Sequence, residues 1–149
     1  MTRVDFYLLN DIAESGKHLA VCKLTQKAFF LGHRIYILAP DHGQAQRLDQ
    51  LLWTFIQGSF IPHGLSTETA DADTPVLIGY DEPPATHEDV LIQLAAQVPE
   101  CFSRFRRVAE VVNGGEQEKA QARERFRFYR DRGYALQTHK ISAGDFVEA

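Results

Sequence analysis

The sequence predicts a three-layer α/β/α domain with a mainly parallel central sheet. Short runs of β-branched and aromatic residues alternate along the chain with longer segments whose apolar residues recur every three or four positions. Strands that alternate with helices favour a parallel sheet covered on both faces. The 149 residues, of which 44% are hydrophobic, suffice for one domain with its own core.

The predicted domain begins with a strand over residues 4–9 and a helix over residues 15–31. The helix is indicated by apolar residues at helical spacing, namely Val21, Leu24, Ala28 and Leu31. Gly32 follows at the position where a left-handed helix stop favours glycine. Residues 34–39 ("RIYILA") form a β-branched and aromatic run, which is typical of a strand buried on both faces.

A second helix is predicted from Asp41 to about residue 55. Asp41, with Gln44 three residues on, has the form of an N-cap and its return partner. The apolar stripe of this helix consists of Leu48, Leu51, Leu52 and Phe55. A turn-rich acidic loop follows, and residues 75–80 form the next predicted strand.

The second half of the chain continues the alternation. We expect strands over residues 90–96, 106–112 and 134–140, with one long helix over residues 116–132 before the last of them. Asn113, in the break "NGG", is expected to cap that helix. Residues 1–140 then form a single domain, and residues 141–149 form a flexible C-terminal tail.

Composition excludes several classes of protein. No run approaches the roughly 20 apolar residues of a membrane helix, and the N-terminus lacks the features of a signal peptide. Cys22 and Cys101 form no disulfide framework, so we expect a cytoplasmic protein with reduced thiols. The net charge of −4 is uneven: residues 1–100 hold 6 Lys/Arg against 13 Asp/Glu, and residues 101–149 hold 10 against 7. Such asymmetry indicates an anionic partner for the basic end or a chance distribution of solvating charge.

The stretch "FYLLNDIAESGKHLAV" has the layout of a phosphate-binding loop without its chemistry. A strand, a loop and Gly16-Lys17 precede a helix, but Asp11 stands where the first glycine is needed and His18 where the magnesium-binding hydroxyl is needed. A carboxylate there repels phosphate, and imidazole is a poor ligand for magnesium. We therefore expect Gly16-Lys17 simply to open a helix on the surface, with no ATP bound.

Other catalytic and metal-binding patterns are missing from the sequence. The six histidines show no metal-ligand spacing, and there is no G-x-S-x-G elbow. Cys22 lies in an apolar helix and is expected to be core packing. We predict no catalytic residues, no metal and no cofactor, while an α/β enzyme with a site assembled from distant residues stays an alternative.

Trp53 indicates a first interaction surface. At about 100° per residue, it points away from the apolar stripe of the second helix. Ile56, Phe60, Ile61 and Pro62 follow and add apolar area. We interpret this as a partner-binding patch with an aromatic anchor. The alternatives are a helix that frays near Trp53 or a cover formed by other elements.

The helix over residues 116–132 indicates a second surface. One face carries Lys119, Arg123, Arg127 and Arg130, and the neighbouring apolar face carries Ala122, Phe126 and Tyr129. From Lys119 to Arg132 there are six basic residues and two acidic ones. An anionic partner explains this clustering, either nucleic acid or an acidic peptide with an apolar end. A merely solvated face is the remaining alternative.

Four segments together resemble one protein family. They are "FYLLN" at the start, "AQRLDQLLW" at 45–53, "SFIPHG" at 59–64 and "ARERFRFYRDRGY" at 122–134. In this order they look like the chi subunit of the bacterial DNA polymerase III holoenzyme, and the resemblance runs over residues 4–140. It implies an α/β fold that looks like a nucleotide-binding domain but holds no nucleotide.

The resemblance also implies a function and partners. Chi is a non-catalytic accessory subunit of the clamp-loader assembly. It pairs with the small psi subunit and grips the acidic C-terminal tail of single-stranded DNA-binding protein, which ends in Pro-Phe and a free carboxylate. A helicase is a further partner that could compete for the psi-facing patch. Direct nucleic-acid binding by the basic helix is the alternative function.

Site residues can be transferred by position. The resemblance assigns the tail site to Lys119, Arg123, Phe126 and Arg127, with Arg130 as an additional residue that steers the acidic stretch. Phe126 and Arg127 stand where Tyr and Lys are expected in the family, so the charge is kept and one hydroxyl is lost. The psi-binding patch falls on Trp53, Phe60 and Pro62.

Overall fold

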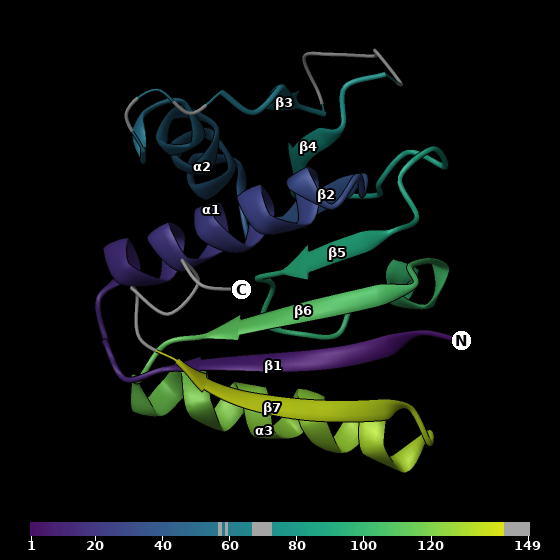
Figure 1. The fold of residues 1–149 in the computed structure, drawn as a ribbon. Helices are drawn as coiled ribbons and strands as arrows, with labels where there is room; N and C mark the ends of the chain where they lie inside the picture. Colours follow the sequence, from purple (N-terminus) through teal and green to yellow (C-terminus); the bar gives the residue numbers. More distant parts are fainter. Residues whose placement is uncertain (57, 59, 67–72, 142–149) are drawn as a thin grey trace.

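Seven parallel strands form the central sheet of the computed structural model, which describes residues 1–56, 58, 60–66 and 73–141. Their order across the sheet is β3-β4-β2-β5-β6-β1-β7 (Figure 1). In chain order the strands are β1 (Arg3–Leu9), β2 (Ile35–Leu38), β3 (His63–Leu65), β4 (Val76–Gly79), β5 (Val90–Gln93), β6 (Arg107–Val112) and β7 (Ala135–Ile141).

Helices cover both faces of this sheet. The helices are α1 (Glu14–Phe30), α2 (His42–Thr54), α3 (Glu116–Asp131) and a short 3₁₀ helix, η1 (Glu100–Arg104). Side chains of α1 and α2 pack with Ile35 and Ile37 of β2, whereas those of α3 and η1 share a second core with Tyr36 and Leu38. Successive residues of one strand thus serve opposite cores, because side chains alternate across a sheet. The predicted three-layer α/β class with a parallel sheet is confirmed.

Several local signals act as predicted. The Asp41 carboxylate caps α2 by accepting a hydrogen bond from the Gln44 backbone N–H at 2.8 Å. Gly32 follows α1 with a φ of +87°, in the left-handed region that favours glycine. Cys22 is fully buried in the core beneath α1.

Two local predictions are wrong, and two short elements are missing from the predicted set. Gly115, not Asn113, is the N-cap of α3, and the Asn113 side chain instead accepts a hydrogen bond from the Gly115 N–H at 2.9 Å. The strand expected to reach residue 96 ends at Gln93, whose side-chain amide hydrogen-bonds both backbone groups of Ala95 and turns the chain. The elements that the sequence did not predict are β3 and η1. The three residues of β3 include a glycine and show no periodic pattern, and this strand is defined by its pairing with β4.

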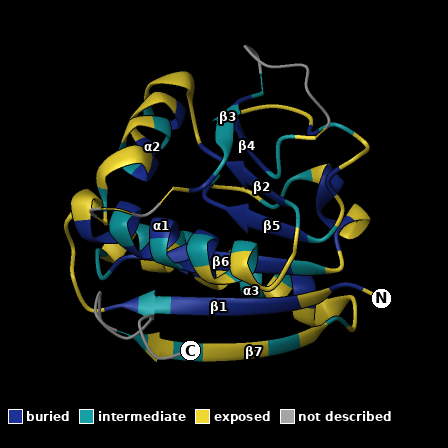
Figure 2. Cartoon of the chain, turned by 45° about the horizontal axis from the view of Figure 1, so that its top comes forward, coloured by how far each residue is buried: buried dark blue, intermediate teal, exposed yellow. Residues whose placement is uncertain are grey.

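Strand β7 closes one edge of the sheet and is mostly exposed, unlike the buried central strands (Figure 2). It pairs along its whole length with β1, from Arg3 opposite Ala135 to Leu9 opposite Ile141. The buried Asp5 carboxylate joins both neighbouring strands, accepting a hydrogen bond from Arg107 at 2.8 Å and lying 3.1 Å from His139. The tail expected over residues 141–149 is wrong at its first residue, because Ile141 is the last residue of β7 and pairs with Leu9. The rest of that segment, residues 142–149, lies outside the described residues.

Candidate functional site

A small apolar pocket lies between the first turns of α3 and strands β1 and β7, and we call it the α3 pocket. Its volume is about 170 Å³. The Phe126 ring lies 5.4 Å from the Phe6 ring, centroid to centroid, and forms part of the wall. The lining residues are Phe6, Leu8, Leu9, Val112, Asn113, Lys119, Ala122, Arg123, Phe126 and Thr138.

Two exposed cations stand at the rim of the α3 pocket. Lys119 lies 3.6 Å from Glu116 in an exposed ion pair, which contributes little stability. Arg123 has no ion-pair or hydrogen-bond partner among the residues that the structure describes. Its guanidinium is therefore available to a ligand without giving up an internal contact. The pocket thus combines an apolar floor with a free bidentate donor.

The structure brings together three of the five residues expected in the tail site. Lys119, Arg123 and Phe126 line the α3 pocket, whereas Arg127 and Arg130 do not. Arg127 pairs with Glu124, and Arg130 pairs with Asp131 at 3.1 Å. Neither Arg127 nor Arg130 is among the residues that line the pocket.

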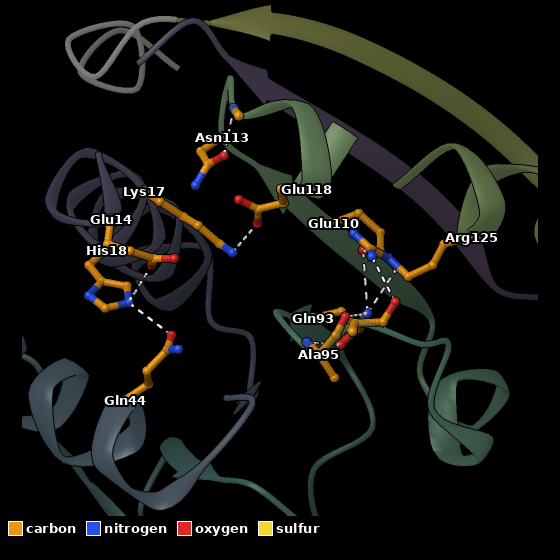
Figure 3. A network of polar contacts seen from close by, with 12 residues as sticks. Glu14, Lys17, His18, Gln44, Gln93, Ala95, Glu110, Asn113, Glu118 and Arg125 are labelled. Atoms are coloured by element: carbon orange, nitrogen blue, oxygen red, sulfur yellow. Dashed lines mark hydrogen bonds and ion pairs between the residues drawn. The ribbon is translucent and has the colours of Figure 1, made fainter. Parts of the chain in front are cut away.

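Arg125 was counted with the basic cluster, but it faces the core. Its side chain is only 5% exposed, and its Nε donates to the fully buried Glu110 at 2.9 Å (Figure 3). The same carboxylate accepts hydrogen bonds from the Tyr129 hydroxyl at 2.8 Å and the Gln93 amide at 3.2 Å. Burial raises the pKa of the Glu110 carboxyl, an effect that Arg125 opposes. One signal in the sequence could have found this pair, since Arg125 lies three residues after Ala122 on the apolar stripe.

The segment that resembles a phosphate-binding loop, between β1 and the first turn of α1, is filled by charged side chains of the protein itself. The Asp11 carboxylate accepts a hydrogen bond from the Ala13 N–H at 2.9 Å and lies directly over Gly16. The Lys17 amine pairs with Glu118 of α3 (Figure 3). Gly16 and Lys17 are buried, so the expectation that they open a helix on the surface is wrong.

A second cavity, of about 440 Å³, opens beside this layout at the carboxyl ends of β1, β2, β5 and β6. It is the crevice in which open α/β sheets commonly bind ligands. Its walls include Lys17, Glu118 and Arg125. Lys17 and Glu118 form an ion pair with each other, and Arg125 forms one with the buried Glu110. We assign it no ligand.

Trp53 lies at the surface as expected, with 48% of its area exposed. Its ring is 5.3 Å from the Phe60 ring, and Phe60 is 63% exposed. The indole ring also lies 4.3 Å from the His63 ring, centroid to centroid, and the His63 ring nitrogens lie 2.6 and 2.8 Å from the backbone oxygens of Ile61 and Asp49. The indole is therefore held on a fixed support. We call Trp53, Ile56, Phe60 and Pro62 the Trp53 patch.

One expected member of the Trp53 patch is buried. Ile61 has no exposed area and belongs to the core beneath α2, so it adds nothing to the surface. Pro62 is half-buried beside it. The chain alternates here as it enters β3, which turns Phe60 outward and Ile61 inward.

The described part of the chain contains neither a membrane-spanning helix nor a cluster of metal ligands. Among those residues, no helix has the length and apolar character needed to cross a membrane. No group of three or more His, Cys, Asp or Glu side chains in the described ranges is arranged to hold a metal ion.

Comparison with known proteins decides the family. The family model of the DNA polymerase III chi subunit, HolC, matches residues 1–137. This chain belongs to that family. It is 42% identical over 141 residues to DNA polymerase III subunit chi of Pseudomonas aeruginosa, covering 95% of this chain and 98% of the relative. It is 33% identical over 143 residues to DNA polymerase III subunit chi of Escherichia coli, covering 93% and 97%.

Membership in the chi family confirms the resemblance given by the four sequence segments. The family gives the chain an accessory role in DNA replication, as a subunit of DNA polymerase III. The α3 pocket and the Trp53 patch lie on different parts of the fold: the first beside β1 and β7 at one edge of the sheet, the second on α2 and the approach to β3 at the other.

Proposed function

We propose that this chi-family chain has no catalytic activity of its own and connects two proteins. Through the Trp53 patch it binds psi and thereby joins the clamp loader. Through the α3 pocket it binds the C-terminal tail of single-stranded DNA-binding protein. The observation that carries the proposal is the apolar α3 pocket with Arg123 at its rim, a cation that no described residue pairs with.

The chemistry of such a tail matches the α3 pocket part by part. The terminal phenyl ring enters the apolar cavity against Phe126 and Phe6. The terminal carboxylate binds the Arg123 guanidinium, which offers a bidentate fork where lysine offers a point charge. Lys119 attracts the acidic stretch and acts mainly on the rate of association. Arg127 and Arg130, already paired and outside the pocket, contribute only to the wider positive field.

A labelled tail peptide titrated into variants tests this proposal. Loss of a charge-assisted, bidentate contact costs on the order of 2–4 kcal/mol of binding free energy. The Arg123→Ala protein should therefore bind the peptide about 30-fold more weakly, or weaker still. Arg130→Ala is the matched control, because it removes the same side chain from the same helix outside the pocket. If the peptide binds the Arg123→Ala and wild-type proteins with equal affinity, Arg123 is not part of the binding site.

Direct nucleic-acid binding is less well supported by the contacts of α3. Of the six cations from Lys119 to Arg132, Arg125 is buried on Glu110, and Arg132 stacks 3.6 Å above the Phe128 ring. Three others pair with acidic neighbours on the same helix. A salt titration with a bare oligonucleotide, run beside the tail peptide, separates the two functions. Oligonucleotide binding without peptide binding would favour the alternative.

The proposal for psi depends on the Trp53 patch. Trp53 and Phe60 offer adjacent aromatic rings, the type of side chain that dominates interface energies. A pull-down from cell extract with wild-type and Trp53→Ala proteins identifies the partner, and psi or a helicase competing for the same patch should be lost from the variant. The proposal includes a cytoplasmic location, which suits the two buried free thiols, Cys22 and Cys101.

A further inference from the structure

We propose that the α3 pocket also binds the chain's own C-terminal segment, residues 142–149. This inference rests on the ligand chemistry of the proposed function, since it concerns the same pocket. The segment, "SAGDFVEA", lies outside the described residues and contains one aromatic residue, Phe146, between the acidic residues Asp145 and Glu148.

The segment and the pocket are complementary in both shape and charge. The α3 pocket measures about 170 Å³, and a cavity of roughly 150 Å³ holds benzene, so one phenyl ring fits. Its wall is mostly apolar, and its rim carries two cations, Lys119 and Arg123, of which Arg123 has no partner within the described part of the chain. Phe146 supplies the ring, and Asp145 beside it supplies a carboxylate for Arg123. The same features make an acidic peptide with an apolar end the ligand of this pocket.

The chain reaches the pocket without a long loop. Ile141, the last residue of β7, pairs with Leu9, and Leu9 itself lines the α3 pocket. Neighbouring strands lie about 4.8 Å apart, so Ile141, the last described residue, lies close to the edge of the pocket. Phe146 follows five residues later, a span of up to about 17 Å.

Binding within one chain competes with binding of an external peptide. A connection of only a few residues between pocket and ligand gives an effective concentration on the order of 1 mM. If the isolated segment binds with a Kd of about 0.1–0.3 mM, the pocket is occupied internally about 3 to 10 times more often than it is free. An external acidic peptide then binds about 4- to 11-fold more weakly than it would to an empty pocket.

The first test compares the full chain with a chain that ends at Ile141 and with the double variant Asp145→Lys/Phe146→Ala. A labelled acidic peptide ending in Phe should bind both altered proteins about 4- to 11-fold more tightly than the full chain. Ser142→Ala is the matched control, because it changes the segment outside its acidic and aromatic residues, and it should leave the affinity unchanged. Equal affinity for the full and the shortened chains overturns the inference.

A second test requires no external peptide. A photoreactive benzoylphenylalanine in place of Phe146 should cross-link within one chain to α3 or β1, and Arg123→Ala should reduce the yield. Cross-links to another region, or only between two chains, overturn the inference. If the cross-link forms on α3 while the external peptide binds no variant, this inference stands and the proposed function falls.

Discussion

Replacing Arg125 with alanine is expected to destabilise the fold strongly, although the residue lies on a helix with an exposed basic face. Among the described residues, Arg125 is the only cation within ion-pair distance of the fully buried Glu110 carboxylate, and its Nη1 also donates to the Ala96 oxygen at 3.0 Å. Removing one partner of a buried ion pair leaves an uncompensated charge and costs about 3–5 kcal/mol. For a chain of this length the midpoint of thermal unfolding should fall by about 10 °C.

The destabilisation should depend on pH with a defined sign. Burial raises the pKa of Glu110 in the folded state, so the folded protein holds this proton more tightly than the unfolded chain does. Loss of Arg125 raises that pKa further, because Arg125 favours the charged form. The difference in stability between wild type and variant should therefore be largest at high pH, where Glu110 is charged in both proteins. It should shrink as the pH falls through the raised pKa and Glu110 takes up a proton, by at most about 1.4 kcal/mol per pH unit.

Urea unfolding followed by circular dichroism at several pH values measures both effects. Arg127→Ala is the matched control, because its exposed pair with Glu124 contributes at most about 1 kcal/mol. A loss below about 1 kcal/mol for Arg125→Ala at pH 7, or a loss that does not vary with pH, would refute this account of the Glu110 network.

Three further outcomes are expected. Trp53→Ala should weaken psi binding by about 2 kcal/mol or more while leaving the unfolding midpoint nearly unchanged, since Trp53 is 48% exposed; loss of folding in the variant would contradict its role as an anchor. Calorimetry with ATP and magnesium should give no heat of binding, because the Asp11 carboxylate lies where phosphate would bind, and micromolar affinity would count against this. Gly114→Ala should cost about 1–3 kcal/mol in a denaturant titration, because the added Cβ would lie 2.4 Å from the Asn10 oxygen, and an unchanged midpoint would show that the loop can shift.

Features that depend on neighbouring residues could be predicted from the sequence alone. The alternation of strand and helix periods predicted the layers, and the spacing of Asp41 and Gln44 predicted the cap of α2. The exposure of Trp53 follows from the rotation of about 100° per residue in a helix. These inferences succeed because backbone geometry is local, so a few consecutive residues contain all the information.

Features that depend on distant partners were decided only by the tertiary structure. Arg123 and Arg125 belong to the same basic segment, yet one points to solvent and the other to Glu110 in the neighbouring strand β6. Lys17 is buried because Glu118, 101 positions away, lies across the crevice. Which cation is free and which is paired is set by packing between elements. The sequence determines the charge of a side chain, whereas the fold determines which opposite charge comes within hydrogen-bond distance of it.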